Sequence, residues 1–305
     1  MEFGKVQHPD KIDFSLPPDD IMTEELLKGL DRGPKGPLQL YVGATRWRIK
    51  EWVGAVYPQK TKEKDFLSQY VRQFNTIELN AMWYNLQPKD VIEKWAALAG
   101  DVFRYCPKYS NTISHELQLK DAGKDTDLFI DHMRHFGRAL GPSFLQLSDG
   151  FGPDRTALLH HYLRQLPPDF RTCVELRQES WFTGGAHQDT WRLFHELGVG
   201  TVITDTSGRR DVIHMRLTAP VAFIRFVSNS GHVTDHLRID AWADRIKSWV
   251  DRGLREVYFF VHAHDEMHTP ALAAYAIGQL NKRCGTHLVP PKSYADDAAK
   301  PLTLF

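Results

Sequence analysis

The chain has 305 residues, 42% of them hydrophobic, enough for the core of one large domain or two small ones. Its 38 basic residues match its 38 acidic residues, which excludes a global positive field for nucleic acid but leaves local patches open. The three cysteines are far apart and include no Cys-x-x-Cys pair, which excludes a zinc ribbon or a disulfide framework. No apolar run approaches the roughly 18 residues of a membrane span, and the first residues lack a signal-peptide pattern. We therefore expect a soluble cytoplasmic protein with no membrane partner.

Residues 1–37 are expected to form an N-terminal arm. Turn and cap residues, Pro17 to Asp20, precede a short helical stretch at 21–30. Glycines and prolines at 33–37 then mark the entry to the main domain.

From residue 38 to 288, apolar segments of strand length alternate with segments of helical period. The strands are expected at 38–42, 76–79, 103–107, 144–147, 172–176, 199–204, 221–226 and 256–261. Helices are expected at 62–74, 88–99, 125–140, 154–166, 186–197, 238–252 and 270–283, with only a loop or short element between Thr204 and Val221. Eight such strands in about 250 residues predict a closed (β/α)8 TIM barrel as a single domain. The alternative is an open doubly wound sheet, but the segment Gly43 to Trp47 after the first strand lacks its glycine-rich phosphate loop.

Polar and ionisable side chains cluster where the expected strands end. In a parallel barrel these ends meet at one mouth, where reactive groups and substrate contacts gather. The catalytic candidates at this mouth are Glu78, Lys108, His115, Glu175 and Asp205. The candidates for substrate binding are Asn80, Trp83, Tyr84, Gln146, Arg177, Trp181 and Arg225. The opposite strand ends are mostly apolar or hydroxylic, and this asymmetry predicts one organised site at the C-terminal mouth.

Each of these residues also has a simpler interpretation. A charged residue near a strand end is often a salt-bridge partner or a loop anchor. Aromatic residues in the loops, such as Trp47, Trp83 and Trp181, either stack on a sugar or base or pack over the barrel. The prediction of a site therefore depends on the whole set and on the closed sheet that brings it together.

Two histidines of the last strand, His262 and His264, lie on one face at a spacing of two. Together with Glu175 and Asp205 they are a candidate set for a divalent metal, zinc, manganese or iron, because imidazole and carboxylate are common ligands. The alternative is a pair of ordinary hydrogen-bonded histidines and a reaction without metal.

The leading functional hypothesis is a hydrolase or lyase that acts on a small anionic or nucleotide-like substrate. Glu78 and Glu175 would exchange protons, while Lys108, Arg177 and Arg225 would hold negative charge. One alternative is a non-catalytic module that binds a ligand in the mouth. Another is a glycoside hydrolase that uses the two carboxylates.

Several motifs resemble the YecE-like family, a TIM-barrel family of unknown function. They are Gly43-x-x-x-Trp47, Trp52-x-Gly54-x-x-Tyr57-Pro58, Glu78-x-Asn80-x-x-Trp83-Tyr84, Lys108 with Ser114-His115, and Glu175-x-Arg177-x-x-Ser180-Trp181. The resemblance covers about residues 40–283 and implies a barrel with a pocket. This chain departs from the pattern at His262 and His264, where the family has an asparagine pair, so the resemblance assigns these two residues no role.

Residues 289–305 are expected to form a flexible tail with an apolar end. The sequence Pro301-Leu302-Thr303-Leu304-Phe305 resembles the peptide by which bacterial DNA polymerases and repair proteins bind the β sliding clamp. Leu302, Leu304 and Phe305 would enter an apolar groove of the clamp. This interpretation links the substrate to DNA repair, whereas the alternative is that the tail folds back onto its own barrel.

Overall fold

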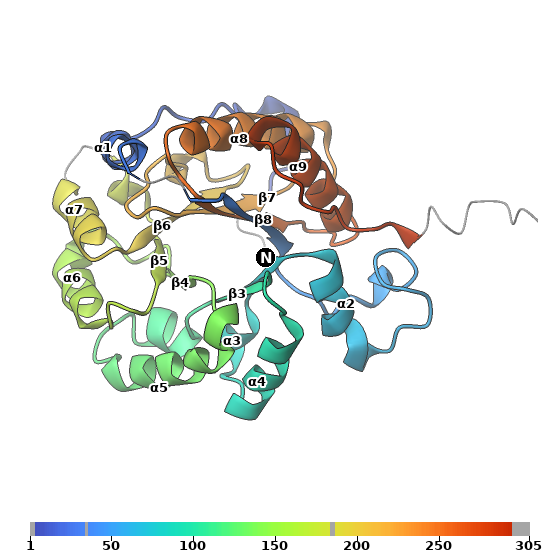
Figure 1. Cartoon of the computed structure of the whole chain (residues 1–305). Helices are drawn as coiled ribbons and strands as arrows, with labels where there is room; N and C mark the ends of the chain where they lie inside the picture. The colour runs from blue at the N-terminus through green and yellow to red at the C-terminus, as the bar shows by residue number, and fades with distance from the viewer. Residues whose placement is uncertain (1–3, 34–35, 184–186, 295–305) are drawn as a thin grey trace, which may run out of the picture.

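The computed structural model describes residues 4–33, 36–183 and 187–294, which contain one barrel of eight parallel strands (Figure 1). The strands are β1 Gln39–Ala44, β2 Thr76–Leu79, β3 Arg104–Pro107, β4 Ser143–Gln146, β5 Thr172–Glu175, β6 Gly200–Asp205, β7 Ala222–Val227 and β8 Glu256–His262. Their order, β3-β2-β1-β8-β7-β6-β5-β4, never reverses. Parallel bridges at Tyr105–Leu140 and Lys108–Phe144 join β3 to β4 and close the ring. The structure confirms the TIM barrel and rules out the open doubly wound sheet.

Helices surround the barrel on its outside (Figure 1), except for a one-turn helix after β2 that lies at the C-terminal mouth. They are α1 Ile21–Asp31, α2 Phe66–Gln73, α3 Ala81–Tyr84, α4 Lys89–Leu98, α5 Gly123–Met133, α6 Thr156–Gln165, α7 Gln188–Glu196, α8 Val233–Asp251 and α9 Thr269–Cys284. Helix α8 begins five residues before the predicted start, because His232 caps it by accepting a hydrogen bond from the amide of Thr234. The described connection between β6 and β7 contains only a 3-10 turn, Arg210–Val212.

Helix α1 covers this connection, which has no long helix of its own. Asp20 caps α1, and the hydroxyl of Thr23 donates to the carbonyl of Met215 at 2.7 Å and accepts from the amide of Leu217 at 2.7 Å. Leu27 is fully buried, with Met22 and Leu26 nearly so. Figure 1 shows α1 between α7 and α8 in the ring of helices. The N-terminal arm is therefore packed into the wall of the barrel domain.

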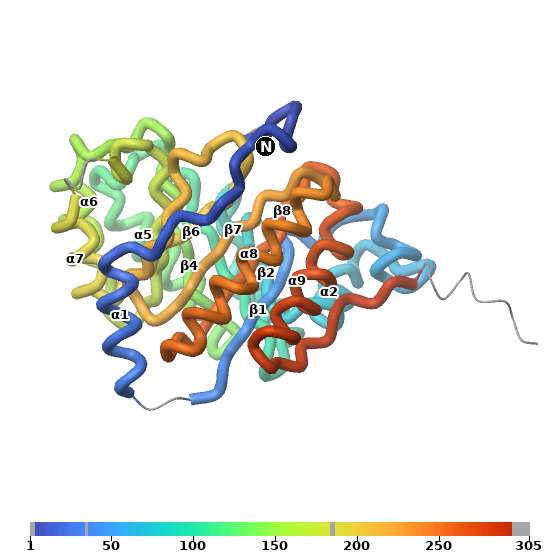
Figure 2. The backbone as a smooth tube through the Cα atoms, turned by 90° about the horizontal axis from the view of Figure 1, so that it is seen from above, coloured from blue at the N-terminus to red at the C-terminus, as the bar shows by residue number. Residues whose placement is uncertain are grey.

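The N-terminal segment before α1 lies along the outside of the barrel. Gly4 accepts a hydrogen bond from the amide of Gly208, in the loop after β6, at 2.8 Å. From there the chain runs down to α1 (Figure 2). Asp19 then accepts hydrogen bonds from Arg245 and Trp249 of α8, at 2.6 and 3.1 Å. These contacts fix the entry to α1.

The barrel interior is layered because successive side chains of a strand point to opposite faces. Its lower layers form an apolar cluster of Tyr41, Cys106, Phe144, Cys173, Val202, Phe223, Tyr258 and Phe260. The next inward position of several strands is polar, as at Glu78, Glu175 and Arg225. At Gly43 of β1 an added Cβ would lie 2.1 Å from the carbonyl oxygen of Thr76, so only glycine fits the close approach of β1 to β2. The layers place a polar floor directly below the C-terminal mouth.

The described part of the C-terminal segment is attached to the barrel. The amide of Lys292 donates to Oε1 of Gln73 at 2.8 Å, and the amide of Tyr294 donates to the carbonyl of Ala55 at 2.7 Å. The proposed clamp-binding residues Leu302, Leu304 and Phe305 lie outside the described residues, so that motif stays a prediction. In the described ranges, no helix is both long enough and apolar enough to cross a membrane.

Candidate functional site at the C-terminal mouth

A pocket of about 680 Å³ opens at the C-terminal ends of the strands. Of the residues predicted from sequence, it is lined by Asn80, Trp83, Tyr84, Lys108, His115, Gln146, Arg177, His262 and His264. The lining also includes Thr45, Arg46, Trp47, Arg48, Ala81, Val227, Ala263 and Glu266. Side chains that lie far apart in the sequence thus meet in one concave site.

A buried ion-pair network lies beside these lining residues. Arg225 donates to both oxygens of Glu78, at 2.8 and 3.0 Å, and to Oε2 of Glu175 at 2.8 Å. Glu175 also accepts hydrogen bonds from Arg177 at 2.8 Å and Thr204 at 2.9 Å. All five side chains are at least nine-tenths buried. The network holds Arg177 in a fixed orientation at the pocket wall.

Both carboxylates of the network are ionised and have their oxygens occupied. Burial alone would raise the pKa of Glu175, but Arg177 and Arg225 lower it to about 2. For Glu78, Arg225 and His262 likewise outweigh burial and hold its pKa well below the ordinary value. Glu78 receives two further hydrogen bonds, from Asn80 at 3.0 Å and His262 at 2.8 Å. This geometry favours a positioning role over the expected acid–base role, and it disfavours a glycosidase, whose general acid needs a raised pKa.

Lys108 extends into the pocket from the end of β3. Lys108 is only 4% exposed, and its Nζ lies 4.7 Å from the centre of the Trp83 ring. Among the described residues it is not ion-paired, since Arg225 and Arg177 occupy Glu78 and Glu175. Burial, followed by the charge of Arg225, lowers the pKa of Lys108 to about 7. A large fraction of the amine is therefore neutral at physiological pH, unlike the fixed cation expected from sequence.

His115 is held in one tautomer by its neighbour. The hydroxyl of Ser114 donates its single hydrogen to the carbonyl of Ser110 at 2.8 Å. The same hydroxyl oxygen lies 2.8 Å from Nδ1 of His115, so Nδ1 must carry the hydrogen of this second bond. Burial and the nearby Lys108 lower the pKa of His115, which keeps the ring neutral. Nε2 is then left with a lone pair, as a proton acceptor requires.

His262, at the end of β8, and His264, just beyond it, do not form a metal site with the predicted carboxylates. Nε2 of His262 donates to Glu78 at 2.8 Å, while Glu175 and Asp205 are bound by arginines. Throughout the described ranges, no three or more histidine, cysteine, aspartate or glutamate side chains are arranged to hold a metal ion. The predicted set of ligands therefore does not fit a divalent metal in this arrangement.

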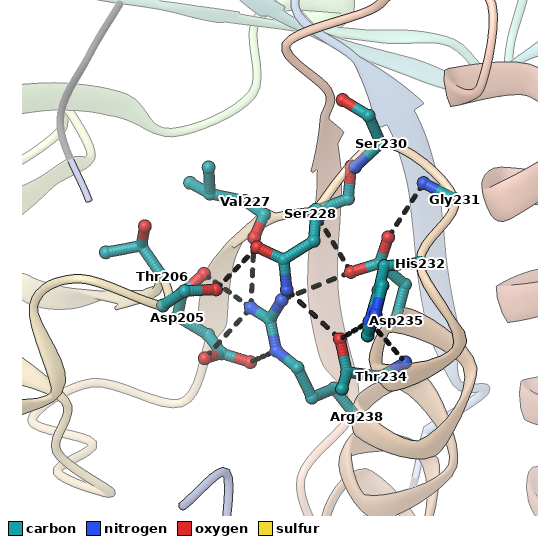
Figure 3. A network of polar contacts seen from close by, with 12 residues as sticks. Asp205, Thr206, Val227, Ser228, Ser230, Gly231, His232, Thr234, Asp235 and Arg238 are labelled. Atoms are coloured by element: carbon teal, nitrogen blue, oxygen red, sulfur yellow. Dashed lines mark hydrogen bonds and ion pairs between the residues drawn. The ribbon is translucent and has the colours of Figure 1, made fainter. Parts of the chain in front are cut away.

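Asp205 and Trp181 are not among the residues that line the pocket. Asp205 follows the inward-facing Thr204 and takes the opposite face, where Arg238 and Trp242 of α8 donate to it at 3.2 and 2.8 Å. Figure 3 shows Arg238 in the centre of this network, which also includes the carbonyl of Val227. Trp181 is 1% exposed, and its Nε1 donates to the carbonyl of Phe151 at 2.7 Å. Both residues stabilise the loops that frame the mouth.

An internal carboxylate fills the position where many TIM barrels bind phosphate. That position is formed by backbone amides after the seventh and eighth strands. Here Asp235 accepts hydrogen bonds from the amides of Asn229 at 2.7 Å and Gly231 at 3.0 Å, the latter visible in Figure 3. These two amides are therefore not available to a bound anion.

The sequence analysis missed three charged residues of the lining: Arg46, Arg48 and Glu266. Arg46 pairs with Glu266 at 3.2 Å, while Thr269 donates to the same carboxylate at 2.9 Å. Burial raises the pKa of Glu266. The two arginines come directly after β1, and a search extended a few residues beyond each strand would have found all three.

Comparison with known proteins was made for the whole chain. Residues 41–295 match the family model described as "Protein of unknown function DUF72". The chain is 28% identical over 252 residues to the UPF0759 protein YecE of Escherichia coli K12. This alignment covers 76% of this chain and 89% of that protein. It is 25% identical over 159 residues to the UPF0759 protein YunF of Bacillus subtilis, covering 50% of this chain and 55% of that protein.

Two solved structures of similar proteins share the fold. A DUF72 family protein from Enterococcus faecalis has a TM-score of 0.62 at 18% identity, covering 82% of this chain and 99% of that one. A DUF72 family protein from Thermotoga maritima has a TM-score of 0.62 at 21% identity, covering 81% of this chain and all of that one. The family match spans most of the barrel described above, and the chain therefore belongs to the DUF72 family of proteins of unknown function.

Proposed function

We propose that this protein is an enzyme that binds a small anionic molecule in the mouth and acts on it by acid–base chemistry, with His115 as proton acceptor. The observation that carries the proposal is the charge of the lining. Three arginines, Arg46, Arg48 and Arg177, line the pocket with one carboxylate, Glu266, and the side chains of Lys108, His115, His262 and His264 complete its polar lining. Arginines that converge on a concave site suit carboxylate or phosphate groups, which they bind through paired hydrogen bonds.

Buried polar atoms in the same lining support a bound ligand. In the described part of the chain, Oε1 of Gln146 and Nε1 of Trp83 are buried without a hydrogen-bond partner. Leaving such a group unsatisfied costs about 1–3 kcal/mol, so a ligand that bonds to them gains affinity. Gln146 is only 3% exposed, and its Oε1 can accept a hydrogen bond from a hydroxyl group of the ligand.

A nucleotide-like ligand is a second candidate within this class. Tyr84 is 78% exposed at the pocket rim and contacts Trp83 edge to face, with ring centres 4.7 Å apart. An exposed aromatic ring beside arginines favours a ligand that has a flat base as well as a phosphate. The proposed link to DNA repair depends on this candidate.

The test is calorimetric binding of small anions to the purified full chain. Phosphate, carboxylic acids, sugar phosphates and nucleoside monophosphates are titrated into the wild type and into Arg48→Ala, which removes an exposed basic residue of the lining. Loss of one charged hydrogen bond costs about 1.5–3 kcal/mol, so affinity should fall roughly tenfold to a hundredfold.

The matched control is Arg164→Ala, an exposed arginine of α6 outside the pocket, which should leave the affinity unchanged. Preference for nucleoside monophosphates over ribose phosphate would select the nucleotide candidate. Failure of every anion to bind, or equal losses in the two variants, would contradict the proposal.

A further inference from the structure

Lys108 is a buried lysine at the pocket wall, and no carboxylate pairs with it among the described residues. Lysine is seldom buried without a carboxylate partner, because an unpaired buried charge is costly. Here the nearby carboxylates are occupied: four hydrogen bonds reach Glu78, and three reach Glu175. Lys108 is nevertheless 96% buried at the pocket wall, which leaves its amine directed at the Trp83 ring.

We propose that Lys108 is a nucleophile that forms a Schiff base with an aldehyde or ketone carrying a carboxylate or phosphate group. This proposal rests on the function proposed above, because the anionic group would be held by the pocket arginines. A lysine amine becomes nucleophilic when it is desolvated or placed near another cation, and both conditions hold here. The pKa of Lys108, lowered to about 7 by burial and by Arg225, agrees with a neutral amine.

The residues around Lys108 fit the steps of imine formation. The lone pair of Nζ attacks the carbonyl carbon, a C–N bond forms, and the carbonyl electron pair moves to oxygen, which takes up a proton. The nitrogen loses both of its protons in turn: the first balances the proton taken up by the oxygen, and the second is delivered to the hydroxyl, which leaves as water. Amine and carbonyl thus yield imine and water. His115 packs against the same Trp83 ring, and the centres of the two rings are 5.5 Å apart. The Nε2 of His115 can accept and return the proton.

An imine at this position defines a reaction class. When it is protonated, it withdraws electrons from the neighbouring carbon, so that a C–C or C–H bond there can break. This is lyase chemistry, and it needs no oxidant or reductant. The buried acceptor of Gln146 is placed in the same lining to bind a substrate hydroxyl.

The experiment is reductive trapping on the folded full chain. Glyoxylate, pyruvate, deoxyribose 5-phosphate and an oligonucleotide with an abasic site are each incubated with the protein and cyanoborohydride. Peptide mass mapping then locates the adduct. We expect one adduct, at Lys108, formed at least tenfold faster at neutral pH than on exposed lysines, with a rate that levels off above pH 7. Reaction of the free compounds identifies a metabolite, and reaction of the oligonucleotide alone identifies a DNA-derived substrate.

Two variants and one set of analogues make the outcomes decisive. Lys108→Arg keeps a long basic side chain but removes the primary amine and should abolish the adduct, whereas Lys94→Arg, at an exposed lysine paired with Asp90, should not. Adducts spread over exposed lysines of the wild type, with Lys108 unlabelled, would overturn the proposal even if the variant misfolds. Lactate and glycerol phosphate, which have no carbonyl, are titrated in parallel. If lactate and glycerol phosphate bind but no carbonyl compound is trapped, the Schiff base is rejected and the anion site is kept. If uncharged propanal is trapped at Lys108 but no anion binds, the Schiff base is kept and the anion site is rejected.

Discussion

Arg225 holds both oxygens of Glu78, with Nε 2.8 Å from Oε2 and Nη2 3.0 Å from Oε1. Its remaining nitrogen, Nη1, donates to Glu175 at 2.8 Å, so one guanidinium pairs with two carboxylates, one from β2 and one from β5. Arg225 is 1% exposed; burial alone would lower its pKa, but the charges of Glu175 and Glu78 outweigh burial and raise it. The whole floor of the pocket depends on this single side chain.

Replacing Arg225 should therefore strongly destabilise the barrel. Arg225→Met leaves two buried carboxylates without their shared partner, and breaking a buried ion pair costs about 3–5 kcal/mol. Urea denaturation measures the loss. Arg138→Met is the control, because Arg138 and Asp101 form an ion pair that is about four-fifths exposed and worth less than about 1 kcal/mol. Similar losses in the two variants would show that the network does not stabilise the fold.

Lys108 should make the stability of the protein rise with pH between about 7 and 10.5. Its pKa is about 7 in the folded state and 10.5 ordinarily, so in this window the unfolded chain binds more protons than the folded chain. The free energy of unfolding of the wild type should gain on the order of 3 kcal/mol relative to Lys108→Met from pH 7 to 10. Below pH 7 the difference should stay constant. A difference that falls with rising pH would contradict the lowered pKa, and Lys94→Met should show no such trend.

The tautomer of His115 can be measured without a substrate. Nitrogen chemical shifts at neutral pH should report hydrogen on Nδ1 and a bare Nε2. His132 is the internal reference: its Nδ1 lies 2.8 Å from the carbonyl of Gln87, which can only accept, so His132 must also carry hydrogen on Nδ1. Ser114→Ala removes the acceptor of His115 and should allow hydrogen on Nε2, without changing His132. A wild-type ring with hydrogen on Nε2 would remove His115 as proton acceptor.

Helix α1 should contribute to stability as strongly as a helix of the barrel itself. Leu27 is fully buried, so Leu27→Ala should lower the free energy of unfolding by about 2–5 kcal/mol. Ile21 begins the same helix but is 55% exposed, and Ile21→Ala should cost far less. Thermal denaturation compares the two. If both variants match the wild type, the arm is an appendage that does not support the barrel.

Strand periodicity predicted most of the fold because each strand of a closed barrel is an apolar run of ordinary length. Strand β2 was predicted at its observed bounds, Thr76–Leu79, and the side chains at strand ends do converge on the mouth. The sequence could not show which guanidinium would occupy Glu78 and Glu175, because that depends on distances across the barrel. Asp205 was misplaced for a simpler reason: Thr204 faces inward, so alternation turns Asp205 outward toward α8. No local signal indicated that α1 would cover the segment before β7.

The position of α1 has a consequence for how the chain folds during synthesis. Thr23 bonds to Met215, 192 residues further along the chain, so α1 leaves the ribosome long before the segment to which it binds has been synthesised. At about 5–20 residues per second this interval is roughly ten to forty seconds. Throughout it α1 lacks the bonds that Thr23 makes with Met215 and Leu217, and such long-range contacts raise the contact order of the barrel, which slows folding.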